Sequence, residues 1–404
     1  MLRRISRRSF LGSVAAAAGA TGMISGLSVA AVSGKKRAVP KQIKMFCSDF
    51  NWLTKGGKTA FAPPGHWAST SPEEYVRWHE DLGANVIHSF AVSCNGYAWY
   101  KSGFVPPQPG LKFDFLPEVV RLAHKKNMLV TSYHCLGANS RWGQEHPDLS
   151  YGTPSTVHIP YTDEYLDFIG KSIADGIKKT GMDVCTLDWL WVPDGCTWAN
   201  GRRDSLRAKG WLETEKKLFT QLTGIRFPAS GAPSDEDTLA YERRAIDRCW
   251  EHIREIRDQT DRNCILCLWV FDPKQPTITG AKFFSEVDWY INENPHPEYM
   301  EFAKQRVGKQ TRLIQNESGW TDPSGVTHDS KAFFSEPKHR SVDLCGFAEP
   351  RDNGLPLSIE EYLSKPVEAF KTSDPRSIND YNVAVLARCF RGMPMDAVVP
   401  RRSF

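Results

Sequence analysis

The chain has 404 residues, with 51 lysines and arginines against 47 aspartates and glutamates. Residues 1–30 hold four of the basic residues and none of the acidic ones, so the remainder of the chain is formally neutral. A neutral chain lacks the excess of cations by which proteins bind nucleic acids or anionic membranes, so we expect neither partner. The length suits one large barrel domain and leaves the oligomeric state open.

The N-terminal residues predict an export signal. Residues 6–11 (SRRSFL) resemble the twin-arginine export motif, and a weakly apolar run follows, with a Ser-Val-Ala tripeptide at 28–30 that suits a signal peptidase. The alternative is a membrane anchor, but the run is rich in Ala, Gly and Ser, whereas a bilayer span needs roughly 20 strongly apolar residues. We predict a signal peptide at 1–30, a linker at 31–41 and a periplasmic or extracellular protein without membrane attachment.

From residue 42 onward, short apolar runs with strand character alternate with segments of helical periodicity. The expected strands cover residues 43–50, 85–93, 128–135, 182–188, 264–271, 288–293, 312–317 and 343–349. The expected helices cover residues 71–83, 114–127, 162–179, 213–222, 238–259, 298–306, 329–334 and 377–390.

Local signals mark several helix ends. Ser71 is followed by Pro72 and two glutamates, which is typical of a helix start, and Gly83 and Gly181 are typical helix stops. Repeated strand–helix units whose strands are apolar on both faces predict an α/β fold, a parallel (β/α)8 TIM barrel. We expect one catalytic domain at 42–404 with a long insertion at 192–236. No glycine-rich loop follows a strand, which argues against a dinucleotide-binding sheet.

Ten cysteines in an exported chain raise the question of disulfides and metals. Most of them lie in or beside the apolar runs, where cysteine behaves as a small hydrophobe. A twin-arginine substrate is exported already folded from a reducing cytoplasm, so its fold should not depend on disulfides. Cys264 and Cys267 have the spacing of a metal pair, but residues three apart on a strand point to opposite faces. We therefore predict structural thiols, no metal and no cofactor.

In parallel barrels the chemistry is located at the carboxyl ends of the strands. Here those ends carry acids and aromatic residues, the profile of a sugar site in which acids cleave the acetal and flat rings stack on the sugar. The predicted substrate-binding residues are Asp49, Trp52, Asn95, Tyr97, His134, Trp191, Trp269, Trp320 and Glu349.

Glycoside hydrolysis needs two carboxyl groups, one that attacks the sugar or activates water and one that protonates the leaving oxygen. Asp188 is the candidate nucleophile, because strand alternation places it on one face with Thr186 while tryptophans follow it at 189 and 191. Its alternative role is that of a buried structural acid. For the acid/base, Glu317 is favoured over Glu293, with Glu349 third.

Several segments resemble the α-L-fucosidase-like glycoside hydrolases and the hypothetical families related to family 29. The resemblance rests on residues 83–100, 111–120, 128–134 and 219–224, and on 186–189 (TLDW), where that superfamily has its nucleophilic aspartate. Fucosidases usually carry a His-His-Asp-Gly-Phe type run after the second strand, but residues 93–97 here are SCNGY. The resemblance thus implies the barrel and the role of Asp188 but not fucose specificity.

These observations together predict an exported, retaining glycoside hydrolase that cleaves a neutral oligo- or polysaccharide. The main alternative is a barrel that binds carbohydrate without cleaving it. Two further alternatives are an exchange of roles, with Glu317 as nucleophile and the fourth-strand acid as proton donor, and a metal-dependent isomerase or hydrolase that uses the acids and His134 as ligands.

Overall fold

The computed structural model describes residues 37–55, 58–152, 157–190, 207, 210–294, 296–319, 328–372 and 377–400. These residues belong to one compact unit. The predicted signal peptide lies outside them, as do Trp191 and Trp320 and residues 192–206 of the predicted insertion. Among the helices described, none is long and apolar enough to cross a bilayer.

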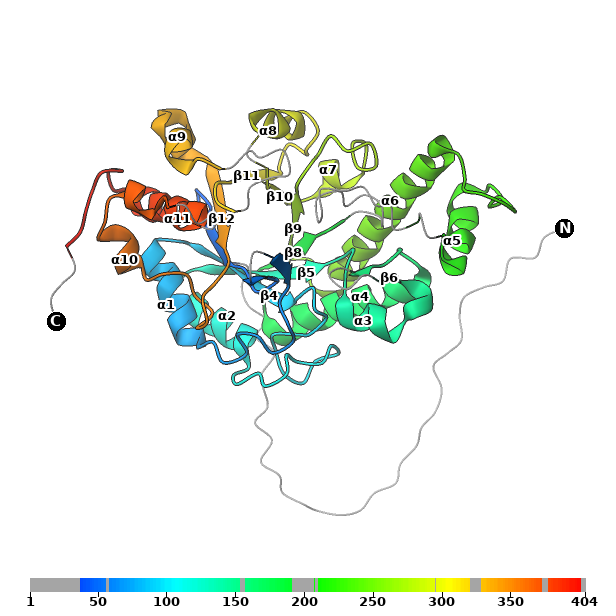
Figure 1. Ribbon diagram of the computed structural model, residues 1–404, viewed down its shortest axis with the longest axis horizontal. Helices are drawn as coiled ribbons and strands as arrows, with labels where there is room; N and C mark the ends of the chain where they lie inside the picture. The colour runs from blue at the N-terminus through cyan, green and yellow to red at the C-terminus, as the bar shows by residue number, and fades with distance from the viewer. Residues whose placement is uncertain are drawn as a thin grey trace, which may run out of the picture. The chain divides into compact units, whose positions relative to one another are not determined.

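Eight parallel strands close into a barrel (Figure 1), which confirms the predicted (β/α)8 fold. Neighbours in the ring are neighbours in the chain, and the last strand pairs with the first, Met45 opposite Cys345. Each of the eight predicted strands is present, with ends shifted by at most a few residues. The strands are β1 (Lys44–Ser48), β4 (Val86–Val92), β5 (Leu129–Cys135), β8 (Val184–Asp188), β9 (Ile265–Val270), β10 (Trp289–Asn292), β11 (Arg312–Asn316) and β12 (Asp343–Ala348).

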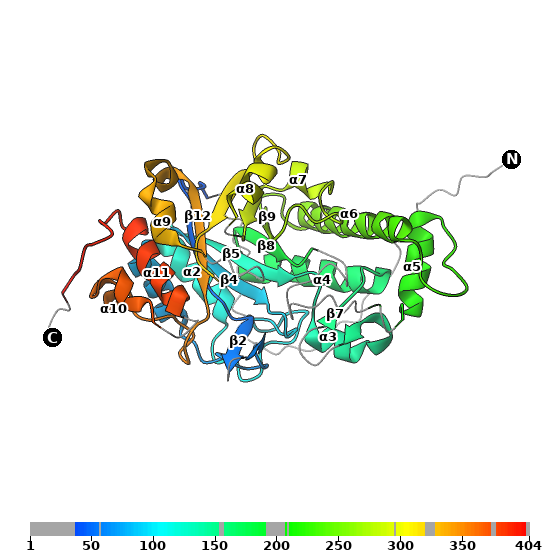
Figure 2. The ribbon, with the colours of Figure 1, turned by 45° about the horizontal axis from the view of Figure 1, so that its top comes forward.

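Helices surround the ring of strands (Figures 1 and 2), because each strand must bury its outward face as well as its inward one. The helices are α1 (Pro72–Leu82), α2 (Phe115–Lys125), α3 (Ser140–Glu145), α4 (Asp163–Thr180), α5 (Glu213–Thr223), α6 (Asp235–Thr260), α7 (Phe283–Glu286), α8 (Pro297–Lys304), α9 (Ser330–Ser335), α10 (Ile359–Leu363) and α11 (Ser377–Phe390). The short helices α3, α7 and α10 were not predicted.

The predicted helix signals act as expected. The Ser71 hydroxyl accepts the N–H of Glu74 at the start of α1, and Gly83 ends that helix with a φ of 86°. Gly181 ends α4 in the same left-handed conformation, with a φ of 68°. Helix α6 begins three residues earlier than predicted, because the Ser234 side chain caps it by accepting the N–H of Asp237.

Two small antiparallel pairs extend the loops that follow strands and were absent from the prediction. Strand β2 (Trp52–Lys55) pairs with β3 (Lys58–Phe61) directly after β1, and β6 (Tyr151–Gly152) pairs with β7 (Val157–His158) after β5. Loops that follow barrel strands lie at the carboxyl end of the barrel, where sites are usually located. The hairpin β2–β3 therefore contributes to the mouth of the barrel.

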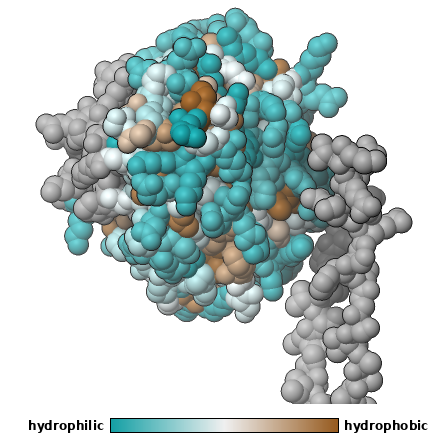
Figure 3. All heavy atoms as spheres, turned by 90° about the vertical axis from the view of Figure 1, so that its right-hand side faces the viewer, coloured by the Kyte–Doolittle hydropathy of each residue, from teal (hydrophilic) through white to brown (hydrophobic). Residues whose placement is uncertain are grey.

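The interior is apolar and tightly filled. All seven residues of β4 are buried, and all nine cysteines in the described residues are free thiols, most of them buried. On the outside, the face that carries α5 is mainly hydrophilic, with small and separate hydrophobic areas (Figure 3). Large exposed hydrophobic side chains in the described residues are few: Phe104, Ile225, Val398 and Val399.

Candidate active site

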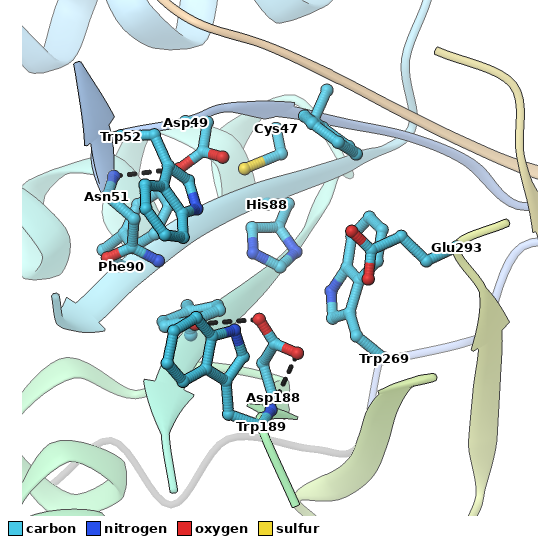
Figure 4. A pocket seen from close by; sticks show the side chains of 12 residues that line it. Cys47, Asp49, Asn51, Trp52, His88, Phe90, Asp188, Trp189, Trp269 and Glu293 are labelled. Atoms are coloured by element: carbon cyan, nitrogen blue, oxygen red, sulfur yellow. Dashed lines mark hydrogen bonds between the residues drawn. The ribbon is translucent and has the colours of Figure 1, made fainter. Parts of the chain in front are cut away.

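A pocket that is partly open to solvent lies at the carboxyl ends of the barrel strands, and the empty space there is about 510 Å³ with open solvent included. It combines three carboxyl groups with a wall of aromatic rings (Figure 4). The lining residues are Cys47, Asp49, Asn51, Trp52, His88, Phe90, Tyr133, Asp188, Trp189, Trp269, Glu293 and Phe347.

Strand alternation explains which residues reach the pocket. Residues two apart on a strand share a face, and β4 thus supplies both His88 and Phe90. Asp188 is the last residue of β8, and Glu293 follows the last residue of β10. Five residues predicted for the site line one pocket: Asp49, Trp52, Asp188, Trp269 and Glu293.

Two hydrogen bonds hold the Asp188 carboxylate. Tyr133 Oη donates to Oδ2 at 2.9 Å, and the backbone N–H of Trp189 donates to Oδ1 at 2.8 Å. Trp189 has a φ of 57°, which is uncommon for a residue other than glycine and marks a sharp turn at the end of the strand. Burial raises the pKa of Asp188 to about 6, although both hydrogen bonds favour the charged form and oppose that shift.

Glu293 is in a different environment. Burial raises its pKa well above the usual range, and the negative charges of Asp188 and Asp49 raise it further. Its main chain is fixed from two sides, since Asn316 Nδ2 donates to the Glu293 carbonyl oxygen at 3.2 Å and His328 Nε2 lies 3.1 Å from the same atom. Figure 4 shows the Glu293 side chain beside Trp269, directed toward the space that Asp188 also faces.

Asp49 is the third acid of the pocket and is 8 % exposed. Its Oδ1 accepts the N–H of Asn51 at 2.9 Å, and burial raises its pKa to about 7. The charges of Asp188 and Glu349 contribute to this rise. Three carboxyl groups in one small volume repel each other, so they do not all carry a charge at neutral pH.

Two predicted site residues lie on the wrong face of their strands. Asn316 pairs with Cys345, two residues before the pocket residue Phe347, so Asn316 has the inward register and Glu317 the outward one. The Glu317 main-chain oxygen accepts the Ser330 hydroxyl from α9, and burial raises the pKa of its side chain. Glu317 does not line the pocket.

His134 shows the same displacement on β5. Tyr133 is the inward residue, and the His134 ring lies against Gly176 of α4, where an added Cβ would be 3.3 Å from Cε1 and Nε2. The pKa of His134 is lowered to about 4 by burial, so it is a neutral residue between barrel and helix. His134 therefore does not line the pocket in which a sugar contact was predicted for it.

Three more predicted residues that the structure describes, Asn95, Tyr97 and Glu349, do not line the pocket. The Asn95 side chain is occupied by hydrogen bonds with Gln108 and with the Ala62 carbonyl oxygen. Glu349 Oε1 accepts the N–H of Thr54 at 3.0 Å and thus ties the β2–β3 hairpin, which carries Trp52, to the end of β12.

Sequence reasoning missed several lining residues. Tyr133 and His88 are the most informative, because one bonds the candidate nucleophile and the other lies between Asp49 and Asp188 in Figure 4. Burial lowers the pKa of His88 to about 3, so the ring is neutral. Strand alternation could have found Tyr133, since the only choice at that end of β5 was which of the neighbours Tyr133 and His134 points into the barrel. No comparable signal singled out His88, because all seven residues of its strand are buried.

The described residues hold no group of three or more His, Cys, Asp or Glu side chains that is arranged to bind a metal ion. The described lining of the pocket offers carboxyl groups, a phenol, a neutral imidazole, a thiol and aromatic faces.

Comparisons with known proteins identify relatives in fold only. No family model matches the sequence, and no curated protein matches it. α-L-fucosidase isoenzyme 2 from Paenibacillus thiaminolyticus has a similar structure, with a TM-score of 0.59 and 14% identity over 86% of this chain. That match covers 49% of the fucosidase, so this chain spans about half of its length.

More distant similarities include the Thermotoga maritima α-fucosidase in complex with fucose, with a TM-score of 0.41, 10% identity and coverage of 81% of this chain and 58% of that one. The α-amylase from Geobacillus thermoleovorans has a TM-score of 0.42 and 11% identity, over 87% of this chain and 79% of that one. The TIM barrel is thus a fold that this chain shares with glycoside hydrolases.

The raised pKa of Asp49 predicts a pH-dependent cost in stability. The ordinary pKa is 3.8 and the folded value is about 7, so the folded state binds this proton more tightly and loses stability as pH rises through that window. Asp49→Asn retains an acceptor for Asn51 without the charge, and should be more stable than the wild type at pH 8 by up to about 4 kcal/mol. The gain should vanish near pH 4. Urea unfolding at both pH values measures it, and an equal effect at both would contradict the assigned cause.

Proposed function

We propose that this protein is a retaining glycoside hydrolase in which Asp188 is the nucleophile and Glu293 the general acid/base. The observation that carries the proposal is the pair of carboxyl groups at the ends of β8 and β10, directed into one aromatic-lined pocket. The similarity to fucosidases and amylases supports the proposal at the level of the fold.

The two environments suit the two roles. Asp188 has two hydrogen-bond donors that hold its carboxylate and a pKa of about 6, so it is ionised at neutral pH. Glu293 has a pKa raised by burial and by the charge of Asp188, so it retains the proton that a general acid must donate. Two carboxyl groups whose surroundings separate their pKa values are the usual arrangement for an acid and a nucleophile.

In the first step Asp188 attacks the anomeric carbon while Glu293 donates its proton to the leaving glycosidic oxygen. The bond to that oxygen breaks, an ester between the sugar and Asp188 forms, and Glu293 is left ionised. In the second step Glu293 takes a proton from water, the resulting hydroxide attacks the anomeric carbon, and Asp188 leaves as a carboxylate. Trp52, Trp189 and Trp269 provide flat surfaces for the apolar faces of the sugar.

Paired substitutions test the roles. Asp188→Asn should lower kcat by at least about 1,000-fold, because it removes the nucleophile, and Glu293→Gln should lower it by about 100- to 10,000-fold. The loss in Glu293→Gln should be smaller for aryl glycosides with acidic leaving groups, which need little protonation. A panel of α- and β-linked aryl glycosides and natural oligosaccharides identifies the substrate on which these rates are measured.

Glu317→Gln is the matched control, since it changes a buried glutamate outside the pocket and should leave the rates near those of the wild type. Normal turnover by Asp188→Asn would refute the nucleophile assignment. Binding of oligosaccharide by the wild type without any hydrolysis across the panel would favour the carbohydrate-binding barrel over the enzyme.

The pH profile should report the nucleophile. For the wild type, kcat/KM should fall as pH drops below about 6, because protonated Asp188 cannot attack. The titratable groups that line the pocket with Asp188 are Cys47, Asp49, His88, Tyr133 and Glu293. Tyr133→Phe removes a hydrogen bond to the carboxylate, so the acid limb should move to higher pH. An acid limb that does not move in Tyr133→Phe would show that another group controls it.

We also propose that the protein is exported by the twin-arginine route, on the basis of residues 6–11. Replacing Arg7 and Arg8 together by lysine should retain the full-length protein in the cytoplasm, because the pathway recognises the arginine pair. Fractionation of cells that express either form measures this. Equal amounts of both forms outside the cytoplasm would argue against twin-arginine export.

A further inference from the structure

The two-carboxyl mechanism leaves one acid of the pocket without a role. Asp49 lines the same pocket as Asp188 and Glu293, and its charge contributes to the raised pKa of Glu293. Its Oδ1 accepts the Asn51 N–H, whereas its Oδ2 has no hydrogen-bond partner within the described part of the chain. A carboxyl group this buried is costly unless it is paired or used.

Nothing in the described lining of the pocket offsets this charge. The twelve lining residues include three acids and no lysine or arginine. The one histidine, His88, is 1 % exposed and neutral, since burial lowers its pKa to about 3. The pocket therefore has a deficit of positive charge that a bound molecule could supply.

Two further features of the pocket walls bear on the guest. His88 Nδ1 and Trp269 Nε1 are buried and have no hydrogen-bond partner in the residues described. Trp52, Trp189 and Trp269 line the space, and indole rings attract cations to their faces. Trp52 and Asp49 both line this space, so the pocket offers a carboxylate as well as aromatic rings (Figure 4).

We infer that Asp49 is a specificity-determining residue and that the pocket accepts a sugar that carries a protonated primary amine. The inference rests on the proposed function, because it names the substrate class of the same site. The ammonium group supplies the missing positive charge and donates to Asp49 Oδ2, while the ring of the sugar contacts the tryptophans. The formal neutrality of the chain after residue 30 predicted a neutral substrate, but binding depends on the charge of the pocket.

The competing view is that Asp49 accepts hydrogen bonds from sugar hydroxyl groups. Asp49→Asn separates the two views, because asparagine has nearly the same shape and can still accept from a hydroxyl group but has no charge for an ammonium group. A hydrogen bond to a charged group contributes about 1.5–3 kcal/mol, which corresponds to about a 10- to 100-fold change in binding or in kcat/KM.

The experiment compares aryl glycosides of glucosamine and galactosamine, in both anomeric forms, with the matched glucosides, galactosides and N-acetylated sugars. The wild type should prefer the free amine by about 10- to 100-fold in kcat/KM. Asp49→Asn should lose that preference, measured within the variant as the ratio of kcat/KM for the free amine to kcat/KM for the matched neutral sugar, so that any change in its overall rate cancels. Asp272→Asn is the matched control, because Asp272 also accepts the N–H of the residue two positions later, Lys274, but does not line the pocket.

The outcomes distinguish this inference from the proposed function. Hydrolysis of neutral or N-acetylated sugars as fast as of the free amines would overturn the inference and leave the hydrolase standing. If no glycoside is cleaved, calorimetric titration with free glucosamine, glucose and N-acetylglucosamine decides. Tighter binding of glucosamine that is lost in Asp49→Asn, but not in Asp272→Asn, would support the inference without hydrolysis. Equal binding of the three sugars would overturn it.

Discussion

Burying three carboxyl groups in one pocket is the constraint on which the rest of the site depends. Each of the three loses hydration, and the charge of Asp188 raises the pKa of both Asp49 and Glu293. The number of donors that the barrel provides differs among them. Asp188 accepts from Tyr133 and from the Trp189 backbone, Asp49 accepts from the Asn51 backbone, and the Glu293 carboxyl has no donor among the described residues. The group with the most donors ionises first, which separates a nucleophile from an acid.

The barrel could be predicted from sequence because its signals are local and repeated. Each strand is a short apolar run. Ser71 marks the start of a helix because its side chain accepts a backbone N–H, and Gly181 marks the end of one because it adopts the left-handed conformation. The site could be predicted only in part. A shift of one residue along a strand exchanges the side chains that point into the barrel with those that point out, and the sequence does not show which set points inward. Asp188 was placed correctly by its own alternation, whereas His134 was chosen in place of Tyr133 and Glu317 turned outward beside Asn316.

Other parts of the site depend on contacts between residues far apart in the chain. The side chain of Glu349 accepts the N–H of Thr54, and this contact fixes the hairpin that carries Trp52. Asn316 and His328 hold the main chain of Glu293 from a different strand and from the residues before α9. Composition and periodicity contain no information about such pairs, so a sequence predicts the acids of a barrel mouth more readily than the groups that orient them.

The described lining of the pocket has no lysine or arginine, and this serves both the proposed catalysis and the proposed recognition of the substrate. Arginines elsewhere in the protein pair with acids, as Arg312 does with Asp343 and Arg207 with Glu215 and Glu242. A similar arginine beside Glu293 would lower the pKa of that group and remove the proton that a general acid must donate. A positive charge carried by the substrate to Asp49 has no such effect on the free enzyme, since it is present only when the sugar is bound. It offsets the charge of the acid that the two-carboxyl mechanism does not use and leaves the difference between Asp188 and Glu293 to the hydrogen bonds of the barrel.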